Sequence, residues 1–209
     1  MSPIPRRGLC LVLAAPSGTG KSTVARRLLA REPNLAASVS VTTRAPRAGE
    51  REGVEYYFRD PAAFAALAAS GGLLEWAEVL GRDSYGTPRA PVEAALASGR
   101  DMIFDIDWQG YRSLRAALPG DVLGVYLLPP TLAALEARLA ARGGDSAAEI
   151  ARRMARARDE MSHAPEFDHV VVNDDLDRAV EDVAAILHAA RLATPRLAGL
   201  SGFLAGLSG

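Results

Sequence analysis

The sequence predicts an α/β fold in which a parallel sheet is covered by helices on both faces. Two observations favour this fold. Several short runs are apolar throughout, as expected of strands buried on both faces, and helix-like segments follow most of them. The first run ends at a glycine-rich loop that leads directly into a helix. With 209 residues and 49% hydrophobic side chains, the chain is long enough for one domain with an insertion.

The predicted elements alternate along the chain. We expect strands at 9–15, 101–107, 122–128 and 169–173. We expect helices at 21–31, 112–118, 131–142 and 177–191. Two stretches break the alternation. Residues 38–58, rich in Thr, Arg, Gly and Tyr, indicate a small mixed insertion, and 143–161 indicate an Arg-rich helix that Ser146 and Glu149 open with capping-box spacing.

The two ends of the chain are less regular. Leu-Ala-Gly-Leu-Ser-Gly occurs at 197–202 and again at 204–209. This tail has too much glycine for a stable helix, so we expect a flexible or loosely docked segment, with a partner-docking segment as the alternative. Arg6 and Arg7 precede an apolar run that is short for an export signal, so we expect a buried strand there and a cytoplasmic protein.

Composition excludes several classes of function. The net charge of −1 argues against a general nucleic-acid or membrane-surface binder. The single cysteine, Cys10, excludes an intramolecular disulfide, and with the scattered His163, His169 and His188 it makes no metal-ligand pattern. No apolar run approaches the ~20 residues of a membrane span. Together with the nearly neutral net charge, this leads us to expect neither a nucleic-acid nor a membrane partner.

The strongest motif is Ala15-Pro-Ser-Gly-Thr-Gly-Lys-Ser22, between the first strand and the first helix. It matches the phosphate-loop pattern G-x-x-x-x-G-K-[ST] with alanine for the first glycine. Gly18 and Gly20 let backbone N–H groups converge on a phosphate at the positive end of the helix. Lys21, the only lysine of the chain, would place a compact ammonium on the β/γ-phosphates, and the Ser22 hydroxyl could ligate Mg²⁺.

Two carboxylates end the second predicted strand. Asp105 and Asp107 are expected at the carboxyl edge of the sheet, where α/β folds place ligands. A carboxylate there can hold Mg²⁺ through water; strand-end solvation is the alternative.

Arginines gather in two further segments. Arg44 and Arg47 lie three residues apart beside Pro and Gly, which suits phosphate binding or an exposed basic loop. Around Gly143-Gly144, the arginines indicate a hinged flap that would bring positive charge to phosphate: Arg138, Arg142 and Arg153. Arg156 and Arg158 are more simply a solvated helix face.

Four motifs in register resemble the guanylate kinase family. They are Ala-Pro-Ser-Gly-Thr-Gly-Lys-Ser-Thr (15–23), Ser-Val-Thr-Thr-Arg-Ala-Pro-Arg-Ala-Gly-Glu (40–50), Asp-Ile-Asp-Trp-Gln-Gly (105–110) and Val-Val-Asn-Asp-Asp-Leu (171–176). The resemblance covers roughly residues 8–191. It implies a P-loop nucleoside-monophosphate kinase fold with a core (1–37, 92–130 and 165–191), a GMP-binding region (38–91), a helical lid (131–164) and a low-complexity tail (192–209).

The resemblance also implies roles for individual residues. ATP would be bound by Ala15, Pro16, Ser17, Gly18, Thr19, Gly20, Lys21, Ser22, Thr23 and Asn173, the last near the adenine. GMP would be bound by Ser40, Arg44, Arg47, Glu50, Tyr56, Glu75, Tyr85, Thr87 and Asp107. The catalytic set would be Lys21, Arg44, Arg138, Arg142, Arg153 and Asp105. Ser22 would ligate Mg²⁺, with Asp105 acting through water.

Three functions remain open on the sequence. The first is transfer of the γ-phosphoryl group of ATP to GMP or dGMP, by a monomer or homodimer with Mg²⁺ as cofactor. The second is a guanylate-kinase-like protein-interaction module without catalysis. Such modules typically lose the intact phosphate loop, whereas this chain keeps Gly20-Lys21-Ser22. The third is a P-loop kinase for another small molecule, which Glu75 and the 40–50 segment argue against.

Overall fold

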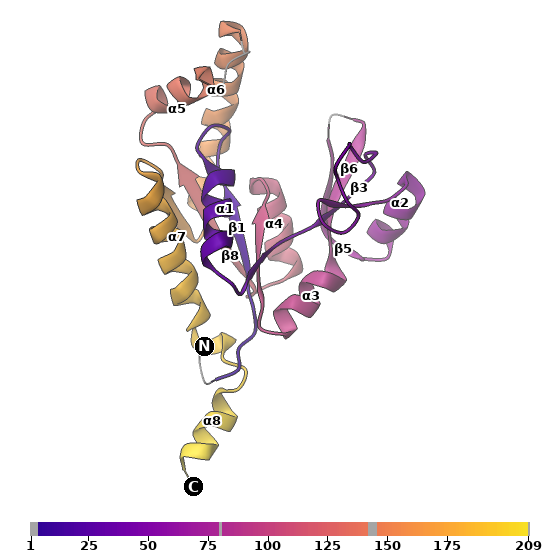
Figure 1. The fold of residues 1–209 in the computed structure, drawn as a ribbon, viewed down its shortest axis with the longest axis vertical. Coiled ribbons are helices and arrows are strands. Elements are labelled where there is room, and N and C mark those ends of the chain that lie inside the picture. Colours follow the sequence, from indigo (N-terminus) through magenta and orange to yellow (C-terminus); the bar gives the residue numbers. More distant parts are fainter. Residues whose placement is uncertain (1–3, 80, 142–145, 209) are drawn as a thin grey trace.

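Two β-sheets organise the chain, and the larger one forms its centre (Figure 1). The computed structural model describes residues 4–79, 81–141 and 146–208. In the larger sheet every strand pair is parallel, and the strand order is β2-β7-β1-β8-β9. Its strands are β1 (Cys10–Ala14), β2 (Leu35–Ala37), β7 (Asp101–Asp105), β8 (Val122–Leu128) and β9 (His169–Val172).

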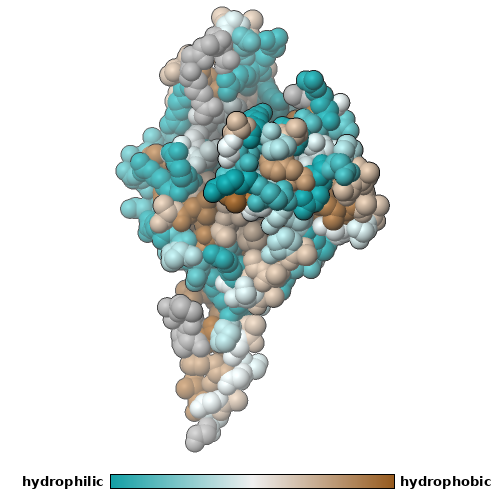
Figure 2. Space-filling model, turned by 45° about the vertical axis from the view of Figure 1, so that its right-hand side comes forward, coloured by the Kyte–Doolittle hydropathy of each residue, from teal (hydrophilic) through white to brown (hydrophobic). Residues whose placement is uncertain are grey.

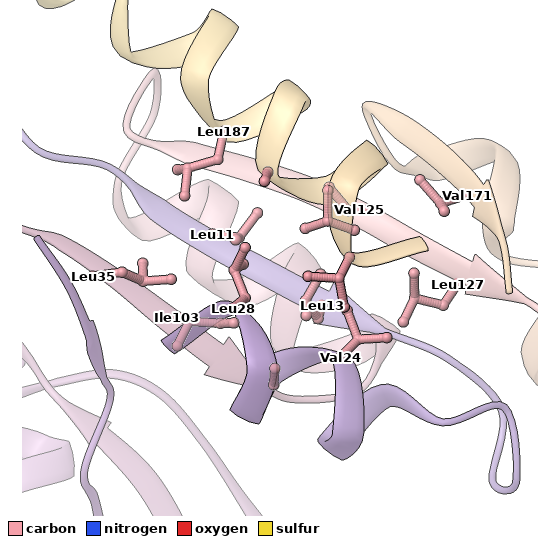
Figure 3. Close-up of a cluster of buried hydrophobic side chains, with 14 of the residues drawn as sticks. Leu11, Leu13, Val24, Leu28, Leu35, Ile103, Val125, Leu127, Val171 and Leu187 are labelled. Carbon is pink, nitrogen blue, oxygen red and sulfur yellow. The ribbon is translucent and has the colours of Figure 1, made fainter. Parts of the chain in front are cut away.

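Helices cover both faces of this sheet, as Figure 1 shows. They are α1 (Lys21–Arg31) and α7 (Leu176–Arg191) on one face, and α3 (Arg89–Ala97) and α4 (Trp108–Ala117) on the other. Figure 3 shows Leu11 and Leu13 of β1 beside Val24 and Leu28 of α1. Because successive side chains of β1 point to opposite faces and both faces are covered, all its residues are buried. The predicted α/β fold with a parallel core is confirmed.

The smaller sheet belongs to the inserted segment. Its strand order is β4-β3-β6-β5, with β3 parallel to β4 and antiparallel to β6. The elements are β3 (Ser40–Thr42), β4 (Tyr56–Phe58), α2 (Pro61–Ala69), β5 (Leu73–Val79) and β6 (Asp83–Pro88). A small apolar cluster of Val41, Phe64 and Leu73 lies beneath it. This sheet lies in and beyond the mixed insertion predicted at 38–58, but β5, β6 and the edge strand β2 of the core sheet were not predicted.

Two helices stand above the carboxyl edge of the core sheet (Figure 1). They are α5 (Leu132–Ala140) and α6 (Ala147–Met161). They pack on each other through Leu135, Leu139, Met154 and Ala157. The predicted capping box is confirmed, since Ser146 accepts from the Glu149 N–H and Glu149 accepts from the Ser146 N–H.

Two predicted boundaries shift at the end of β7. The strand ends at Asp105 rather than 107, and α4 begins at Trp108 rather than 112. The cause is the Asp107 side chain, which accepts hydrogen bonds from the N–H groups of Gln109 and Gly110 and so caps the helix early.

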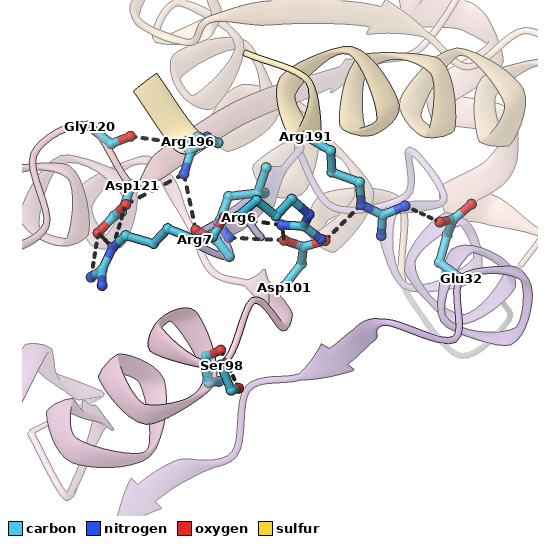
Figure 4. Close-up of polar contacts among 12 residues, drawn as sticks. Arg6, Arg7, Glu32, Ser98, Asp101, Gly120, Asp121, Arg191 and Arg196 are labelled. Atoms are coloured by element: carbon cyan, nitrogen blue, oxygen red, sulfur yellow. Dashed lines mark hydrogen bonds and ion pairs between the residues drawn. The ribbon is translucent and has the colours of Figure 1, made fainter. Parts of the chain in front are cut away.

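The two chain ends are tied together at the amino edge of the sheet, opposite the glycine-rich loop. Figure 4 shows fully buried Asp101 between Arg6, at 2.7 Å, and Arg191, at 2.8 Å. Asp121 binds Arg7 at 2.8 Å, and Arg196 donates to the Gly120 carbonyl at 2.7 Å. Residues 192–199, which include the short 3₁₀-helix η2 (Thr194–Arg196), therefore dock on the body of the protein.

The last segment corrects a sequence prediction. Instead of an irregular tail, the structure contains α8 (Leu200–Leu207), which carries Gly202 and Gly206. The Gly199 N–H donates to the Pro5 carbonyl at 2.9 Å, which anchors the start of the helix. In Figure 2 this helix forms the tapered lower end, largely apolar and exposed. Among the described residues, no helix is long and apolar enough to cross a membrane.

Candidate active site

The glycine-rich loop joins the carboxyl end of β1 to the first turn of α1. Gly18 and Gly20 have φ values of 95° and 101°, which is a region that favours glycine. Close packing adds a second reason, because a Cβ on Gly18 would lie 2.8 Å from Leu139 Cδ2 and one on Gly20 would lie 2.7 Å from Asn173 Nδ2. The N–H groups of Lys21 and Ser22 precede the first helical hydrogen bonds, in which Thr23 and Val24 donate to the Gly20 carbonyl, so they are available to an anion.

A lysine, a serine and an aspartate meet at the start of α1. The Lys21 Nζ lies 2.5 Å from one carboxylate oxygen of Asp105, and the Ser22 hydroxyl donates to the other at 3.2 Å. Asp105 comes from the end of β7, the strand next to β1, so parallel pairing brings it to the loop. Nearly half of the Asp105 side chain is exposed, so the group is accessible from solvent.

These residues line a hollow of about 540 Å³ at the carboxyl edge of the core sheet. From the predicted site it contains Ala15, Pro16, Ser17, Gly18, Gly20, Lys21, Ser22, Thr23, Asp105, Asp107 and Arg153. Asp107 lies two residues beyond Asp105 and caps α4. Arg153, from α6, donates to the Ser17 hydroxyl at 2.7 Å and so links that helix to the loop.

Three predicted residues lie behind the loop instead of lining the hollow. Thr19 is fully buried, and its carbonyl accepts from Asn173 Nδ2 at 2.6 Å. Arg138 of α5 donates to the Asn173 carbonyl at 3.0 Å and to the Thr19 carbonyl at 3.4 Å. Arg142, the remaining arginine predicted for this side, lies outside the described residues.

The smaller sheet brings together a second group of predicted residues. Glu75 of β5 faces Thr87 of β6, whose hydroxyl donates to the Glu75 carboxylate at 2.6 Å. Burial raises the pKa of Glu75, the Thr87 hydrogen bond opposes that shift, and the negative charge of Asp107 adds to it. Asp107 is therefore close enough to connect this group electrostatically to the hollow. Ser40 lies in β3, between β4 and β6 in the same sheet.

Arginine and tyrosine side chains cluster beside this pair. Arg44 binds both oxygens of Glu50, at 2.8 and 2.9 Å, and lies 5.3 Å from the centre of the Tyr56 ring. The Tyr56 and Tyr85 rings contact each other edge to face. The hydrogen bond from Arg44 lowers the pKa of Glu50, and the same bond raises the pKa of Arg44. Glu50 also accepts from the backbone N–H of Arg47, whose side chain is exposed, so one carboxylate holds the Arg44 guanidinium and the backbone of Arg47.

The hollow also has walls that the sequence analysis did not assign to it: Trp108, Tyr126, Arg156 and Glu160. Trp108 stacks on His163 with ring centres 3.6 Å apart. The Tyr126 hydroxyl donates to the Glu160 carbonyl at 2.7 Å and so holds the end of α6. The signal for Trp108 was present, because it directly follows Asp107 in a recognised motif. The sequence held no such indication for Tyr126, because it lies in an apolar strand.

A second cluster braces the turn after α6, where the 3₁₀-helix η1 (Ala164–Glu166) begins. Glu166 binds Arg112 with both oxygens at 2.6 Å and accepts from His163 Nδ1 at 2.7 Å. Arg112, together with His163, lowers the pKa of Glu166 to about 2. Arg112 and Trp108, which contact each other, both belong to α4, so these contacts fix the turn after α6 to α4.

The oxygen donors in the hollow suit one kind of metal ion. A serine hydroxyl and one carboxylate lie within hydrogen-bond distance of each other, and Mg²⁺ prefers such ligands together with water and substrate phosphates. In the described parts of the chain, no group of three or more His, Cys, Asp or Glu side chains could hold a metal by itself. The Ser22 hydroxyl and the Asp105 carboxylate therefore fit such an ion.

Comparison with known proteins gives one consistent result. The model of the guanylate kinase family matches residues 7–190. The chain is 60% identical over 208 residues to a guanylate kinase of Gluconobacter oxydans, with both proteins covered in full, and 55% identical over 201 residues to that of Rhodospirillum rubrum, covering 96% of this chain and 92% of that protein.

A solved structure agrees. The guanylate kinase of Anaplasma phagocytophilum is 35% identical and superposes with a TM-score of 0.74, covering 97% of this chain and 96% of that one. Sequence, fold and site point the same way: this chain belongs to the guanylate kinase family.

Proposed function

We propose that this protein transfers the γ-phosphoryl group of ATP to GMP, and to dGMP, giving ADP and GDP or dGDP. The observation that carries the proposal is the intact phosphate loop, with Lys21, Ser22 and Asp105 in contact, in a member of this family. A protein-interaction module would not need these three groups together. Membership of the family favours an enzyme, and the interaction module is not favoured.

The donor side would be the hollow at the phosphate loop. The β- and γ-phosphates of ATP would accept from the backbone N–H groups at the start of α1, with the Lys21 ammonium beside them. Its present partner, Asp105, is half-exposed, so exchange of that ion pair for a phosphate contact costs little free energy. Arg153, which already reaches Ser17, would add positive charge from α6.

The acceptor base would bind at the pair formed by Glu75 and Thr87. Guanine presents N1–H and N2–H₂ as donors on one edge, and an ionised Glu75 can accept from both. Adenine presents an unprotonated N1 there, which would face the carboxylate without a hydrogen bond. A site built on such hydrogen bonds can discriminate by about 10⁴–10⁵. Ser40, in the same sheet, would complete the recognition of the base.

The acceptor phosphate would be held by the arginine and tyrosine cluster, composed of Arg44, Arg47, Tyr56 and Tyr85, with Glu50 orienting the arginines. Bidentate guanidinium groups suit a phosphate monoester. A GMP phosphate oxygen attacks the γ-phosphorus of ATP, and the bond from that phosphorus to the β–γ bridging oxygen breaks. The attacking group is already an anion, so no general base is required.

Mg²⁺ fits this reaction as the cofactor. It would be held by the Ser22 hydroxyl and the nucleotide phosphates, with Asp105 contacting it through water. When bound, it would neutralise negative charge on the phosphates. The catalytic residues of this chain would be Lys21, Arg44, Arg138, Arg142, Arg153 and Asp105, with Arg138 acting through the loop that it braces.

Each part of the fold would have its own role: the smaller sheet, the core sheet, and the helices α5 and α6. Residues 38–91 would take GMP, 131–164 would act as the lid, and the core would hold ATP. We further propose a monomer or homodimer that acts without nucleic acid or membrane partners, as the net charge of −1 favours.

The test is a coupled assay for ADP formation with ATP, Mg²⁺ and one acceptor at a time. The acceptors are GMP, dGMP, AMP, CMP and UMP. We expect turnover with GMP and dGMP alone. Turnover with AMP would retain a kinase but contradict the role of Glu75. Folded protein that binds ATP and phosphorylates none of the five would overturn the proposed function.

A further inference from the structure

The phosphate loop is held from behind by a buried amide. Asn173 directly follows β9, and only 4% of the residue is exposed. Its side-chain Nδ2 donates to the carbonyl oxygen of Thr19 at 2.6 Å, although the two residues lie 154 positions apart. We propose that Asn173 is a positioning residue that sets the conformation of the phosphate loop, and that it serves ATP through this loop rather than through a contact with adenine.

The contact controls the direction of one peptide group. In a trans peptide, the C=O of one residue and the N–H of the next point in opposite directions. Because the Thr19 carbonyl points at Asn173, behind the loop, the N–H of Gly20 is turned towards the hollow. Gly20 lines the hollow and Thr19 does not. The amide of Asn173 thereby aims a donor at the place where an ATP phosphate would lie.

Besides Asn173, the Thr19 carbonyl accepts from Arg138 at the longer distance of 3.4 Å. The N–H of Thr19 donates to the Pro16 carbonyl at 3.2 Å, which closes the turn. The residue is fully buried, so water cannot replace a lost partner of the carbonyl without a rearrangement. A buried carbonyl that loses its main donor carries a desolvation penalty, and rotation of the peptide is the simplest way to relieve it.

Asn173 is itself held in position by three contacts. Its N–H donates to the Leu128 carbonyl at 2.8 Å, which fixes it to the end of β8. Its carbonyl accepts from Arg138, and that guanidinium also reaches the Thr19 carbonyl at 3.4 Å. Its amide packs against Gly20, where an added Cβ would lie 2.7 Å from Nδ2. The brace therefore connects β8, β9 and α5 to one peptide of the loop.

The inference rests on the proposed use of this loop for ATP, and a ligand without a base separates the two roles of Asn173. The experiment measures equilibrium binding of a non-hydrolysable ATP analogue, its uridine counterpart and inorganic tripolyphosphate, each with Mg²⁺. It compares the wild type with Asn173→Ala and Asn173→Asp. The matched control is Asp174→Ala, because this neighbour is half-exposed and its carboxylate accepts from the Asp175 N–H rather than from the loop.

We expect Asn173→Ala to weaken all three ligands by about tenfold and by the same factor, as loss of one buried hydrogen bond predicts. Asp174→Ala should bind all three ligands with wild-type affinity. The affinity of Asn173→Ala for GMP should also stay at the wild-type level. Asn173→Asp keeps the volume but presents a carboxylate to a carbonyl oxygen, so it should weaken binding at least as much. Should Asn173→Ala fail to fold, the isosteric Asn173→Asp provides the same comparison of the three ligands.

Two outcomes overturn the inference. One is weaker binding of the adenosine ligand alone, with uridine and tripolyphosphate affinities unchanged, since that result indicates an adenine contact. The other is wild-type affinity for all three ligands. The binding data need no turnover, so a wild-type protein that fails to phosphorylate GMP would refute the proposed function without deciding this inference.

Discussion

The two sheets of this protein differ in what holds them together. In the core sheet, β1 is buried along its whole length between helices on both faces. In the smaller sheet, all three residues of β4 are only half-buried and most of β5 is exposed beyond Leu74. The phosphate loop thus follows a strand in a close-packed layer, whereas the residues proposed to bind GMP lie in a sheet with few buried side chains.

Local polar contacts partly replace apolar packing in the smaller sheet. Glu50 pairs with Arg44, six residues away, and Glu52 binds the N–H of Phe58 and the side chain of Arg59. These contacts shape single loops and leave the sheet joined to the core by few buried residues. Regions with few buried apolar contacts open at lower free energy. We therefore expect the GMP-binding region to deform more readily than the loop that would bind ATP.

The largest expected effect comes from the phosphate loop. Lys21→Ala should lower the rate of transfer by about 10³-fold, because it removes a charge placed beside the transferred group. Stability should change little, since the ion pair of Lys21 with half-exposed Asp105 contributes little in water. The coupled assay and the thermal unfolding midpoint measure the two effects. Wild-type turnover in the variant would contradict the assigned role of the loop.

A matched pair of leucines tests the difference in packing. Leu11→Ala in β1 should lower the free energy of unfolding by about 3 kcal/mol, and Leu73→Ala in β5 by about 2 kcal/mol. Only Leu73→Ala should also raise the KM for GMP, because it loosens the smaller sheet. Urea unfolding and steady-state kinetics below the unfolding range supply both numbers. Equal losses of stability would show that the two layers are equally well packed.

Glu75→Gln tests the proposed recognition of guanine by the smaller sheet. We expect kcat/KM for GMP to fall about thirtyfold, equivalent to about 2 kcal/mol, since the variant loses a charged acceptor. The KM for ATP should remain near its wild-type value. The conservative variant Thr87→Ser keeps the hydroxyl that contacts Glu75 and serves as the control. A proportional loss for both substrates would contradict the guanine contact.

The smallest effect is a shift in pH dependence. The pKa of Glu75 is raised mainly by burial, and GMP binding requires the ionised carboxylate. As pH falls, kcat/KM for GMP should therefore begin to drop at a higher pH than an ordinary glutamate would cause. Glu75→Gln should remove this inflection and leave the titration of the GMP phosphate. For folding the sign is opposite, because a raised carboxyl pKa makes stability fall as pH rises from 4.5 through that pKa.

The phosphate loop and the smaller sheet also differ in how well they could be predicted from the sequence. The strand before the phosphate loop, the loop itself and α1 were predicted to within about a residue, because each depends on a short contiguous segment. Glu75 and Thr87 were assigned only through resemblance to a family. Nothing local in their strands shows that they face each other, since β6 contains Gly86 and Pro88 and forms through pairing with β5 and β3.

The sequence by itself determined the α/β class, the phosphate loop with Lys21 and Ser22, and the capped start of α6. Apolar periodicity, glycine positions and caps act over a few residues, so they can be recognised in the linear chain. Only the tertiary structure decided that Trp108 stacks on His163 and that Asn173 supports the carbonyl of Thr19. Those contacts join residues 55 and 154 positions apart, and the crossovers of a parallel sheet bring them together at one edge.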